Sequence, residues 1–510
     1  MKQRVLMCFF LGTLMLIATA AHCQNKNIKS EISHITAAAG GEGMRHRQIA
    51  ASRGNMPELS SAENRLQHKW QAKPVRTRPN IIFLLTDDQR WDAMGVAGNP
   101  VIKTPNMDKL ASAGIYFRNA YVTTSICCVS RASIVTGQYE SRHGIHDFAT
   151  NLSARALSQT YPALLKKAGY KTGFIGKFGV GKDFPDQLFD FSVNTEAGGK
   201  GQPDYITRDA NDHEIHDTDT LDHAILRFLD QYANVPFCLS VSFKAPHEQD
   251  GLPPEFIIQP RYKEYYKEVV IPHPVTAAPE YWNKLPAFLK TDSNLARIRW
   301  KGLFGTDQLY QENVKNYYRL ITGVDDVLGD IVRKLKALDI DQNTIIILMG
   351  DNGFFLGEHG MEGKWYGYEE SIRVPLFIYN PRFPDKIRQT RPDKIALNID
   401  IAPTILSMAG VPVPAQMQGM NLLGLMQNDI PERNSFFYQH YFLGGYQIPQ
   451  MEGVVTKSFK YMKFIEHGDE VLFDIKNDPH ETTNLVSVAK YREVLNMLRR
   501  EYMKLKKESF

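Results

Sequence analysis

The chain has 510 residues, of which 43% are hydrophobic and 23% are charged, as in an ordinary globular protein. Its net charge of +4 is small for this length, so the composition predicts neither a nucleic-acid partner nor binding to an anionic membrane. Apart from the N-terminal segment, no stretch is long and apolar enough to predict a transmembrane helix.

The first residues have the order of a secretory signal. Lys2 and Arg4 precede an apolar run at residues 5–17, and small residues follow at 18–21. This order predicts a signal peptide over residues 1–23 and a secreted or periplasmic mature protein.

The cysteines and the segment after the signal bear on lipid anchoring, flexibility and disulfide bonding. His22 precedes Cys23 and disfavours lipid anchoring at that cysteine. Residues 24–77 are polar and rich in turn residues, which predicts a flexible leader. Three cysteines lie further along the chain: Cys127, Cys128 and Cys238. An odd number in an oxidising compartment argues against a disulfide scaffold.

Apolar runs and helical patterns alternate through the rest of the chain. Continuous apolar runs at residues 81–85, 237–243 and 345–349 predict strands buried on both faces of a parallel sheet. Helical patterns fall between them, at residues 105–114, 161–170, 218–233 and 317–338. The alternation predicts a doubly wound α/β domain, with ligands at the carboxyl ends of its strands.

The lengths and order of the predicted elements change after residue 411. Shorter strand-like pieces follow at residues 453–465 and 470–479, and a helical pattern closes the chain at 490–509. The sequence therefore predicts a catalytic domain over residues 78–411 and a smaller α+β subdomain over 412–510.

Two of the predicted strands end in adjacent polar residues. Asp87 and Asp88 follow the first strand, and Asp351 and Asn352 follow the strand at 345–349. Such pairs are common in turns. Because parallel strands open onto one edge of a sheet, however, the two pairs are expected to converge there and to bind a hard cation such as Ca²⁺ or Mg²⁺.

The segment "TTSICCVSRASIVTGQY" places two cysteines side by side, without the C-x-x-C spacing of a redox or zinc site. Either both are buried as small hydrophobic residues, or one of them is chemically special. Arg131 follows in a segment that can begin a helix, whose N-terminal amides would favour an anion.

Three further cationic side chains fall at strand ends or in loops: Lys177, His247 and Lys364. Taken singly, each is expected to be an ordinary surface or loop residue. Gathered around a metal together with Arg131, they would stabilise an oxyanion ester and its transition state.

Six segments, in order, resemble the type I sulfatases, the formylglycine-dependent branch of the alkaline-phosphatase-like superfamily. They are "NIIFLLTDDQ", "CCVSRASIVTGQY", "AGYKTGFIGKFG", "KAPHEQ", "GDNGFFLGEHGMEGKWYGYEESIRVPLFIYNP" and "LFDIKNDPHETTNL". The double-cysteine form is similar to the glucosamine-6-sulfatase branch. The resemblance implies an alkaline-phosphatase-like αβα sandwich and an exported enzyme that removes sulfate from a sulfated carbohydrate.

The resemblance also implies a chemistry for the paired cysteines. Cys127 aligns with the residue that a maturation enzyme oxidises to formylglycine, and Cys128 fills the variable position beside it. The hydrated aldehyde offers one hydroxyl as a nucleophile, and collapse to the aldehyde then expels sulfate. One Ca²⁺, in preference to Mg²⁺, would be bound by the modified Cys127 and four further residues: Asp87, Asp88, Asp351 and Asn352.

The remaining roles follow from the same alignment. Arg131 would hold the hydrate and lower its pKa, and Lys177 would contact the sulfate. His247 and Lys364 would contact the sulfate too and assist the departing alcohol oxygen.

Two positions depart from the family pattern. Val129 stands where the signature has Pro or Ala, and Gly179 stands where many members have a histidine. His143 and His146 are predicted to supply a replacement imidazole. His440, in an aromatic-rich segment, is a further predicted contact for a sugar.

Two other functions remain open from the sequence. Sulfate and phosphoryl esters share tetrahedral geometry, so the same motifs suit a phosphomonoester or phosphonate hydrolase. An unmodified, inactive relative would bind a sulfated glycan without cleaving it.

Overall fold

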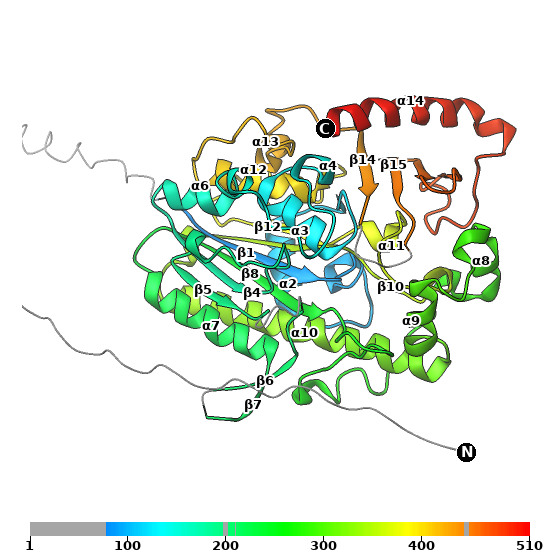
Figure 1. Ribbon diagram of the computed structural model, residues 1–510. Helices are drawn as coiled ribbons and strands as arrows, with labels where there is room; N and C mark the ends of the chain where they lie inside the picture. The colour runs from blue at the N-terminus through cyan, green and yellow to red at the C-terminus, as the bar shows by residue number, and fades with distance from the viewer. Residues whose placement is uncertain (1–77, 197–201, 210, 443–447) are drawn as a thin grey trace, which may run out of the picture. The chain divides into compact units, whose positions relative to one another are not determined.

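A seven-stranded sheet lies at the centre of the computed structural model, which describes residues 78–510 except 197–201, 210 and 443–447 (Figure 1). The predicted signal peptide and leader lie outside the described residues. In spatial order the strands are β2 (Ile115–Tyr116), β12 (Leu376–Tyr379), β9 (Thr344–Gly350), β1 (Asn80–Asp87), β8 (Phe237–Pro246), β4 (Lys171–Gly176) and β5 (Phe191–Asn194). Only β12 runs antiparallel to its neighbours, so the predicted mostly parallel α/β sheet is confirmed.

Side chains of β1 alternate between two hydrophobic cores. Ile81, Phe83 and Leu85 pack on one face of the sheet, and Ile82 and Leu84 pack on the other. All five are at most 5% exposed, and burying each contributes about 1.5–3 kcal/mol. Burial on both faces is the reason that this strand is a continuous apolar run in the sequence.

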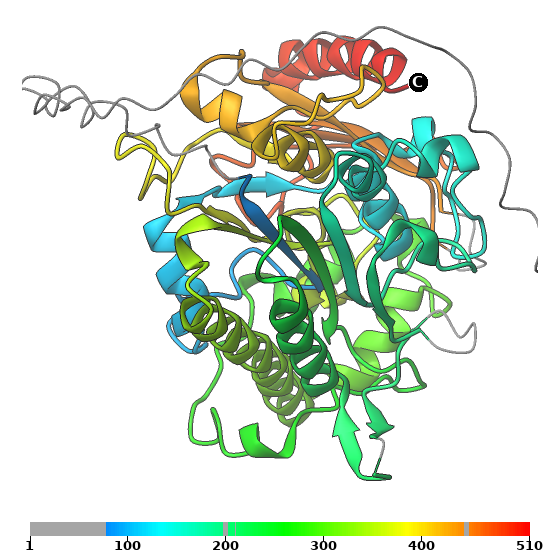
Figure 2. The same cartoon turned by 90° about the vertical axis from the view of Figure 1, so that its left-hand side faces the viewer.

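Helices cover both faces of the sheet, as the view along the sheet in Figure 2 shows. On one face pack α2 (Pro105–Ala113), α7 (Asp217–Tyr232) and α10 (Asp307–Ala337). On the other pack α3 (Cys127–Thr136), α6 (Tyr161–Lys167) and α12 (Ile401–Met408). This three-layer arrangement confirms the predicted αβα sandwich.

Two helices begin earlier than the sequence pattern predicts. α10 begins at Asp307, where Thr306 accepts a hydrogen bond from the Leu309 amide at 3.2 Å. Tyr310 and Val314 already pack in the core among polar neighbours, so the apolar face extends ahead of the start predicted at 317. α3 begins at Cys127 itself and ends at Thr136, followed by Gly137, which has the left-handed φ of 66° common at helix ends.

A second sheet and the last helix follow in the C-terminal part. Its antiparallel strands are β14 (Ser435–His440), β15 (Met451–Thr456), β16 (Lys460–Phe464) and β17 (Glu470–Phe473). Helix α14 (Arg492–Ser509) packs on this sheet through a core that includes Phe437, Leu498 and Tyr502 (Figure 1). The boundary predicted after residue 411 falls between α12 and α13 (Leu422–Gln427).

Shorter elements complete the described chain. The small strands pair as β3 (Asn119–Tyr121) with β13 (Ile395–Leu397), β6 (Ile206–Arg208) with β7 (Glu214–His216), and β10 (Phe355–Leu356) with β11 (Glu362–Gly363). The remaining α-helices are α4 (Glu140–His143), α5 (Ala154–Leu157), α8 (Pro279–Lys284), α9 (Leu295–Leu303) and α11 (Glu369–Ile372). None of the helices in the described part has the length and apolar character needed to cross a membrane.

Candidate active site

The register of the central sheet brings the predicted site residues together. β1 pairs with β9 up to Thr86 and Gly350, and it pairs with β8 up to Asp87 and Pro246. The chain therefore leaves three adjacent strands at the same edge, as expected for parallel neighbours. Four side chains, named here the acidic cluster, meet at this edge: Asp87, Asp88, Asp351 and Asn352.

Members of the acidic cluster contact one another and leave oxygen atoms without partners. The Asp88 amide donates to Asp351 Oδ1 at 3.1 Å, and Asn352 Nδ2 donates to Asp88 Oδ1 at 2.5 Å. Asp88 Oδ2 and Asn352 Oδ1 are buried and have no hydrogen-bond partner. Unpartnered buried oxygens are costly in a protein interior, and carboxylate and amide oxygens are the ligands of hard cations. The donor set therefore fits a Ca²⁺ or Mg²⁺ ion.

Cys127 lies against the acidic cluster at the first position of α3. Its Sγ is 3.3 Å from Asp87 Oδ1 and 3.1 Å from Lys364 Nζ. Burial, reinforced by the Asp87 carboxylate, raises the pKa of the Cys127 thiol to about 12. An unmodified thiol here stays protonated at neutral pH and is a poor nucleophile.

Cys128 has a different environment. It is fully buried in the apolar core beneath α3, as Cys238 is in β8, and neither forms a disulfide. Of the two readings of the cysteine pair, burial as a small hydrophobic residue applies to Cys128, while Cys127 faces polar groups.

Two of the predicted cations pair with the acidic cluster on its buried side. Arg131 Nε donates to Asp351 Oδ2 at 2.8 Å, and Lys177 Nζ donates to Asp87 Oδ2 at 2.5 Å. Burial alone would raise the pKa of Asp87, but the charged Lys177 and Arg131 outweigh it and hold this pKa well below its usual value.

The other two predicted cations lie on the open side of the acidic cluster. Lys364 Nζ contacts Asp88 Oδ1, and His247 Nε2 is 3.4 Å from Asp88 Oδ2. His247 Nδ1 donates to the Glu248 carbonyl at 2.6 Å, which fixes the ring and directs Nε2 at the acidic cluster. Burial, with Lys364 adding to it, lowers the pKa of His247 well below its usual value, so the imidazole is neutral.

A pocket of about 200 Å³ opens above Cys127. Besides His247 and Lys364 it is lined by Arg299, whose guanidinium contacts Glu248 and donates from Nε to Glu362 Oε2 at 2.9 Å. The sequence does not group these three residues, because they come from distant parts of the chain. Its signals are that Glu248 directly follows His247 and that Glu362 lies two residues before Lys364.

The three other predicted histidines are not part of this site. His143 Nε2 lies 3.0 Å from Ser133 Oγ, and His146 Nδ1 lies 2.9 Å from Glu140 Oε1. His440 is buried in β14, where neither ring nitrogen has a hydrogen-bond partner. None of the three is among the described residues that line the pocket at Cys127.

Gly179 occupies a position that excludes a side chain. Its φ is +70°, a conformation unfavourable for other residues. A Cβ placed there would lie 2.8 Å from Arg131 Cδ and 3.5 Å from Lys177 Cε. The space where a histidine side chain would begin is thus taken up by Arg131.

A buried acid–cation cluster beside the N-terminus of a helix, at the carboxyl edge of a parallel sheet, defines a hydrolase site for an anionic ester. The sulfatase family model matches residues 79–411, and a model for the C-terminal part of N-sulphoglucosamine sulphohydrolase matches residues 357–508. The chain belongs to the sulfatase family, and it is a sulfatase with the alkaline-phosphatase-like fold.

Three known proteins show how similar this chain is to its relatives in sequence and in fold. The chain is 29% identical over 496 residues to an N-acetylglucosamine-6-O-sulfatase of Bacteroides thetaiotaomicron, covering 84% of this chain and 86% of that protein. The solved structure of BT4656 in complex with its substrate D-glucosamine-2-N,6-O-disulfate superposes with a TM-score of 0.73 at 28% identity, covering 85% and 98% of the two chains. A phosphonate monoester hydrolase of Agrobacterium radiobacter shares the fold, with a TM-score of 0.71 at 21% identity over 85% and 96%.

Proposed function

We propose that this sulfatase is exported and removes sulfate esters from a sulfated amino sugar, using a formylglycine made from Cys127 and one bound Ca²⁺. The observation that carries the proposal is the position of Cys127 Sγ, within 3.3 Å of Asp87 and 3.1 Å of Lys364 at the start of α3. In the proposed organisation, residues 78–411 carry the reaction, and residues 412–510 form the C-terminal subdomain.

Two findings support the substrate class. One relative is named for action on the 6-O-sulfate of N-acetylglucosamine, and one neighbouring structure contains a disulfated glucosamine as its substrate. Both proteins match this chain over more than four-fifths of its length.

The acidic cluster would hold the ion. Asp88 Oδ2 and Asn352 Oδ1 are its unpartnered oxygens, and Asp87 and Asp351 supply further carboxylates. When present, the ion and the formylglycine supply positive charge and a nucleophilic oxygen of lowered pKa beside the sulfate. Arg131 keeps Asp351 and Asp87 in place from the buried side.

The residues on the open side would bind and orient the sulfate group. Lys364 brings its ammonium group to the position where negative charge develops, and Lys177 supports it by holding Asp87 from the buried side. His247 is held with Nε2 toward the same point and unprotonated, so it would first accept a proton at Nε2 and then return it to the departing alcohol oxygen. The Arg299 guanidinium, fixed between Glu248 and Glu362, forms the wall against which a sugar would lie.

Parallel kinetics with two esters of one alcohol test the reaction class. We expect kcat/KM for 4-nitrophenyl sulfate to exceed that for 4-nitrophenyl phosphate by at least 100-fold in protein made in a host with the maturation enzyme. Faster turnover of the phosphate would replace the proposal with a phosphohydrolase. No turnover of either ester, together with retained binding of a sulfated glycan, would replace it with an inactive binding protein.

Release of sulfate from glucosamine-6-sulfate and glucosamine-2-N-sulfate, measured by ion chromatography, tests the substrate. Turnover of glucosamine-6-sulfate supports the amino-sugar assignment, because that sugar carries a sulfate ester. Turnover of the N-sulfate alone would replace the proposal with a sulfamidase, because that group is bonded through nitrogen. Turnover of the aryl sulfate alone would overturn the assignment and leave the reaction class intact. N-terminal sequencing of the mature protein tests export: a start near residue 24 is expected, and an intact Met1 would contradict it.

A further inference from the structure

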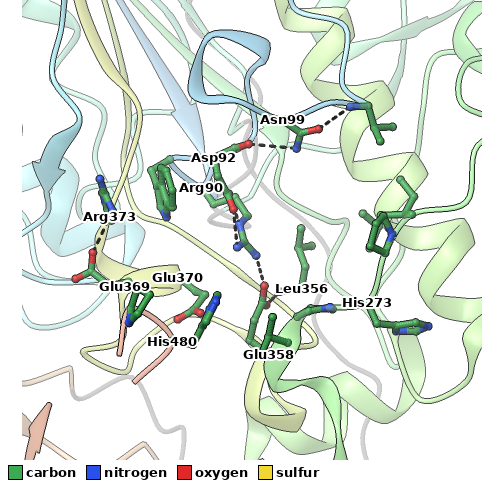
Figure 3. Close-up of a pocket in the computed structure, with 18 of the residues that line it drawn as sticks. Arg90, Asp92, Asn99, His273, Leu356, Glu358, Glu369, Glu370, Arg373 and His480 are labelled. Carbon is green, nitrogen blue, oxygen red and sulfur yellow. Dashed lines mark hydrogen bonds and ion pairs between the residues drawn. The ribbon is translucent and has the colours of Figure 1, made fainter. Parts of the chain in front are cut away.

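A second cavity, of about 620 Å³, lies apart from the pocket at Cys127, and the two share no lining residue among those described. Its wall includes the turn after β1, the loop and helix at Glu358–Glu370, and the loop at His480 (Figure 3). Residues 271–275 and side chains of α10 also line it. Its size is within the range of small-molecule sites, and its lining combines aromatic rings with charged groups.

Most charged side chains of this cavity are already paired. Arg90 binds Asp92 through two contacts, at 2.5 and 2.9 Å, and its third nitrogen contacts Glu358 at 2.6 Å. The other oxygen of Glu358 accepts a hydrogen bond from the Leu356 amide at 2.6 Å. These groups have little capacity left for a ligand.

Glu369 is paired as well. Its carboxylate lies 2.9 Å from Lys460 Nζ and 3.5 Å from Arg373 Nη1. The Arg373 guanidinium in turn stacks on the Trp91 ring, 4.1 Å from its centroid, so both are held at the cavity wall.

Glu370 is the exception. It is 6% exposed, and its Oε2 atom is buried with no hydrogen-bond partner. Figure 3 shows its carboxyl group between Glu369, His480 and Glu358, facing the cavity. Burial, with Glu358 and Glu481 adding to it, raises the pKa of Glu370 well above its usual value. A buried carboxyl group without a partner is costly, and a cation beside it would remove that cost.

The charges around Glu370 also favour a bound cation. Five carboxyl groups lie at the cavity wall around Glu370 or directly behind it: Asp92, Glu358, Glu369, Glu370 and Glu481. Four permanent cations oppose them: Arg90, Arg373, Lys457 and Lys460. This part of the cavity therefore carries one carboxyl group more than cations, and Glu370 is the carboxyl group with an unpartnered oxygen.

We propose that this cavity binds a small primary ammonium compound, whose charged nitrogen pairs with the Glu370 carboxylate. Two sources share this chemistry: an amino sugar with a free amine, whose ring would lie against the wall at Trp91 and Tyr121, and an aliphatic diamine. The site is separate from the acidic cluster, so the proposal does not depend on turnover at Cys127.

Calorimetric titration of the full-length protein tests the proposal without a variant. Glucosamine hydrochloride and N-acetylglucosamine differ only in the charge and acetylation of one nitrogen. We expect glucosamine to bind at least tenfold more tightly at matched ionic strength. Equal binding of both sugars, or binding of neither glucosamine nor 1,4-diaminobutane, would overturn the proposal. Comparable binding of 1,4-diaminobutane would support it and identify the ammonium group alone as the recognised feature.

Glu370→Gln locates the site, because it preserves the shape of the side chain and removes its charge. We expect a loss of at least tenfold in glucosamine affinity, with aryl sulfate turnover within twofold of the wild type. Glu264→Gln, at an exposed glutamate, is the matched control and should bind as the wild type does. Undiminished affinity in Glu370→Gln would mean that glucosamine binds elsewhere, and would overturn the assignment to this cavity.

Discussion

Cys127 shows how one side chain can be held in place and kept unreactive. Its thiol is buried among opposite charges, and its raised pKa leaves too little thiolate for nucleophilic attack. Oxidation to an aldehyde would replace this thiol with a group whose reactivity does not require a free thiolate. The position of this residue, against Asp87 and Lys364 at the start of α3, is consistent with a modified residue.

Lys364 is predicted to be the most sensitive cation on the open side, because it alone contacts both Cys127 Sγ and Asp88 Oδ1 among the described residues. Lys364→Ala should lower kcat for an aryl sulfate by about 100-fold to 1000-fold, the effect of removing one preorganised charge. Lys301→Ala, at a half-exposed lysine paired with Asp292, is the control and should retain full turnover. A fall of less than threefold for Lys364→Ala would contradict the assigned role.

Gly179 and Gly410 form a matched pair for testing why this chain lacks a histidine at position 179. Both have φ of +70°, but a Cβ at Gly410 meets nothing within 4 Å, whereas one at Gly179 meets Arg131. Gly410→Ala should cost about 1–2 kcal/mol from the left-handed backbone alone and leave turnover unchanged. Gly179→Ala should destabilise more and lower turnover at least tenfold. Equal effects of the two changes, measured by denaturant unfolding and initial rates, would refute the steric explanation.

At the scale of elements, Lys460 of β16 joins the C-terminal sheet to α11. It is fully buried, with Nζ 2.9 Å from Glu369 Oε1 and 2.8 Å from Glu481 Oε1. Lys460→Ala removes the cation that two buried carboxylates share, leaving Glu369 with the Arg373 ion pair and Glu481 without this one. The loss should lower the free energy of unfolding by about 3–5 kcal/mol. Lys463→Ala, in the same strand and partly exposed, should change it by less than 1 kcal/mol, about the effect of a surface substitution. Similar unfolding midpoints for both variants would show that the buried ion pairs contribute little.

The elements that the sequence predicted well are those with a single physical cause. β1, β8 and β9 are buried on both faces, so they are continuous apolar runs, and parallel pairing then placed their polar ends at one edge. β2 and β3 have two and three residues, too few for any period to be visible. The start of α10 was misplaced because the buried apolar residues of its first turns, Tyr310 and Val314, are few and stand among polar residues.

The site residues likewise divide into those that a sequence signal predicts and those that only tertiary packing brings together. The acidic cluster could be predicted because its members directly follow predicted strands. Arg299, Glu248 and Glu362 could not be grouped, because only tertiary packing joins them across more than 100 residues. His143 and His146 were selected for closeness in sequence to Cys127, yet α3 carries the chain onward and their ring nitrogens bind Ser133 and Glu140.

At the scale of the whole molecule, the ion is predicted to stabilise the fold as well as to support catalysis. The acidic cluster holds three carboxyl groups that repel one another, and a bound cation would stabilise the native state relative to the unfolded chain. Treatment with EDTA should therefore lower the unfolding midpoint by several degrees and abolish turnover. Added Ca²⁺ should restore both more fully than Mg²⁺.

Two results would contradict this prediction. An unfolding midpoint that stays constant after complete metal removal, verified by elemental analysis, would exclude a stabilising ion. Full activity of the metal-free protein would exclude a catalytic one.

Formylglycine at position 127 is the central claim, and the mass of the tryptic peptide covering residues 119–131 tests it most directly. The protein should be made in its native host, because Val129 departs from the signature that the maturation enzyme reads in the family. We expect a mass with an aldehyde in place of one thiol, and fragment ions that place it at 127 and leave Cys128 intact. A peptide with both thiols unmodified would contradict the account and favour a glycan-binding or phosphohydrolase function.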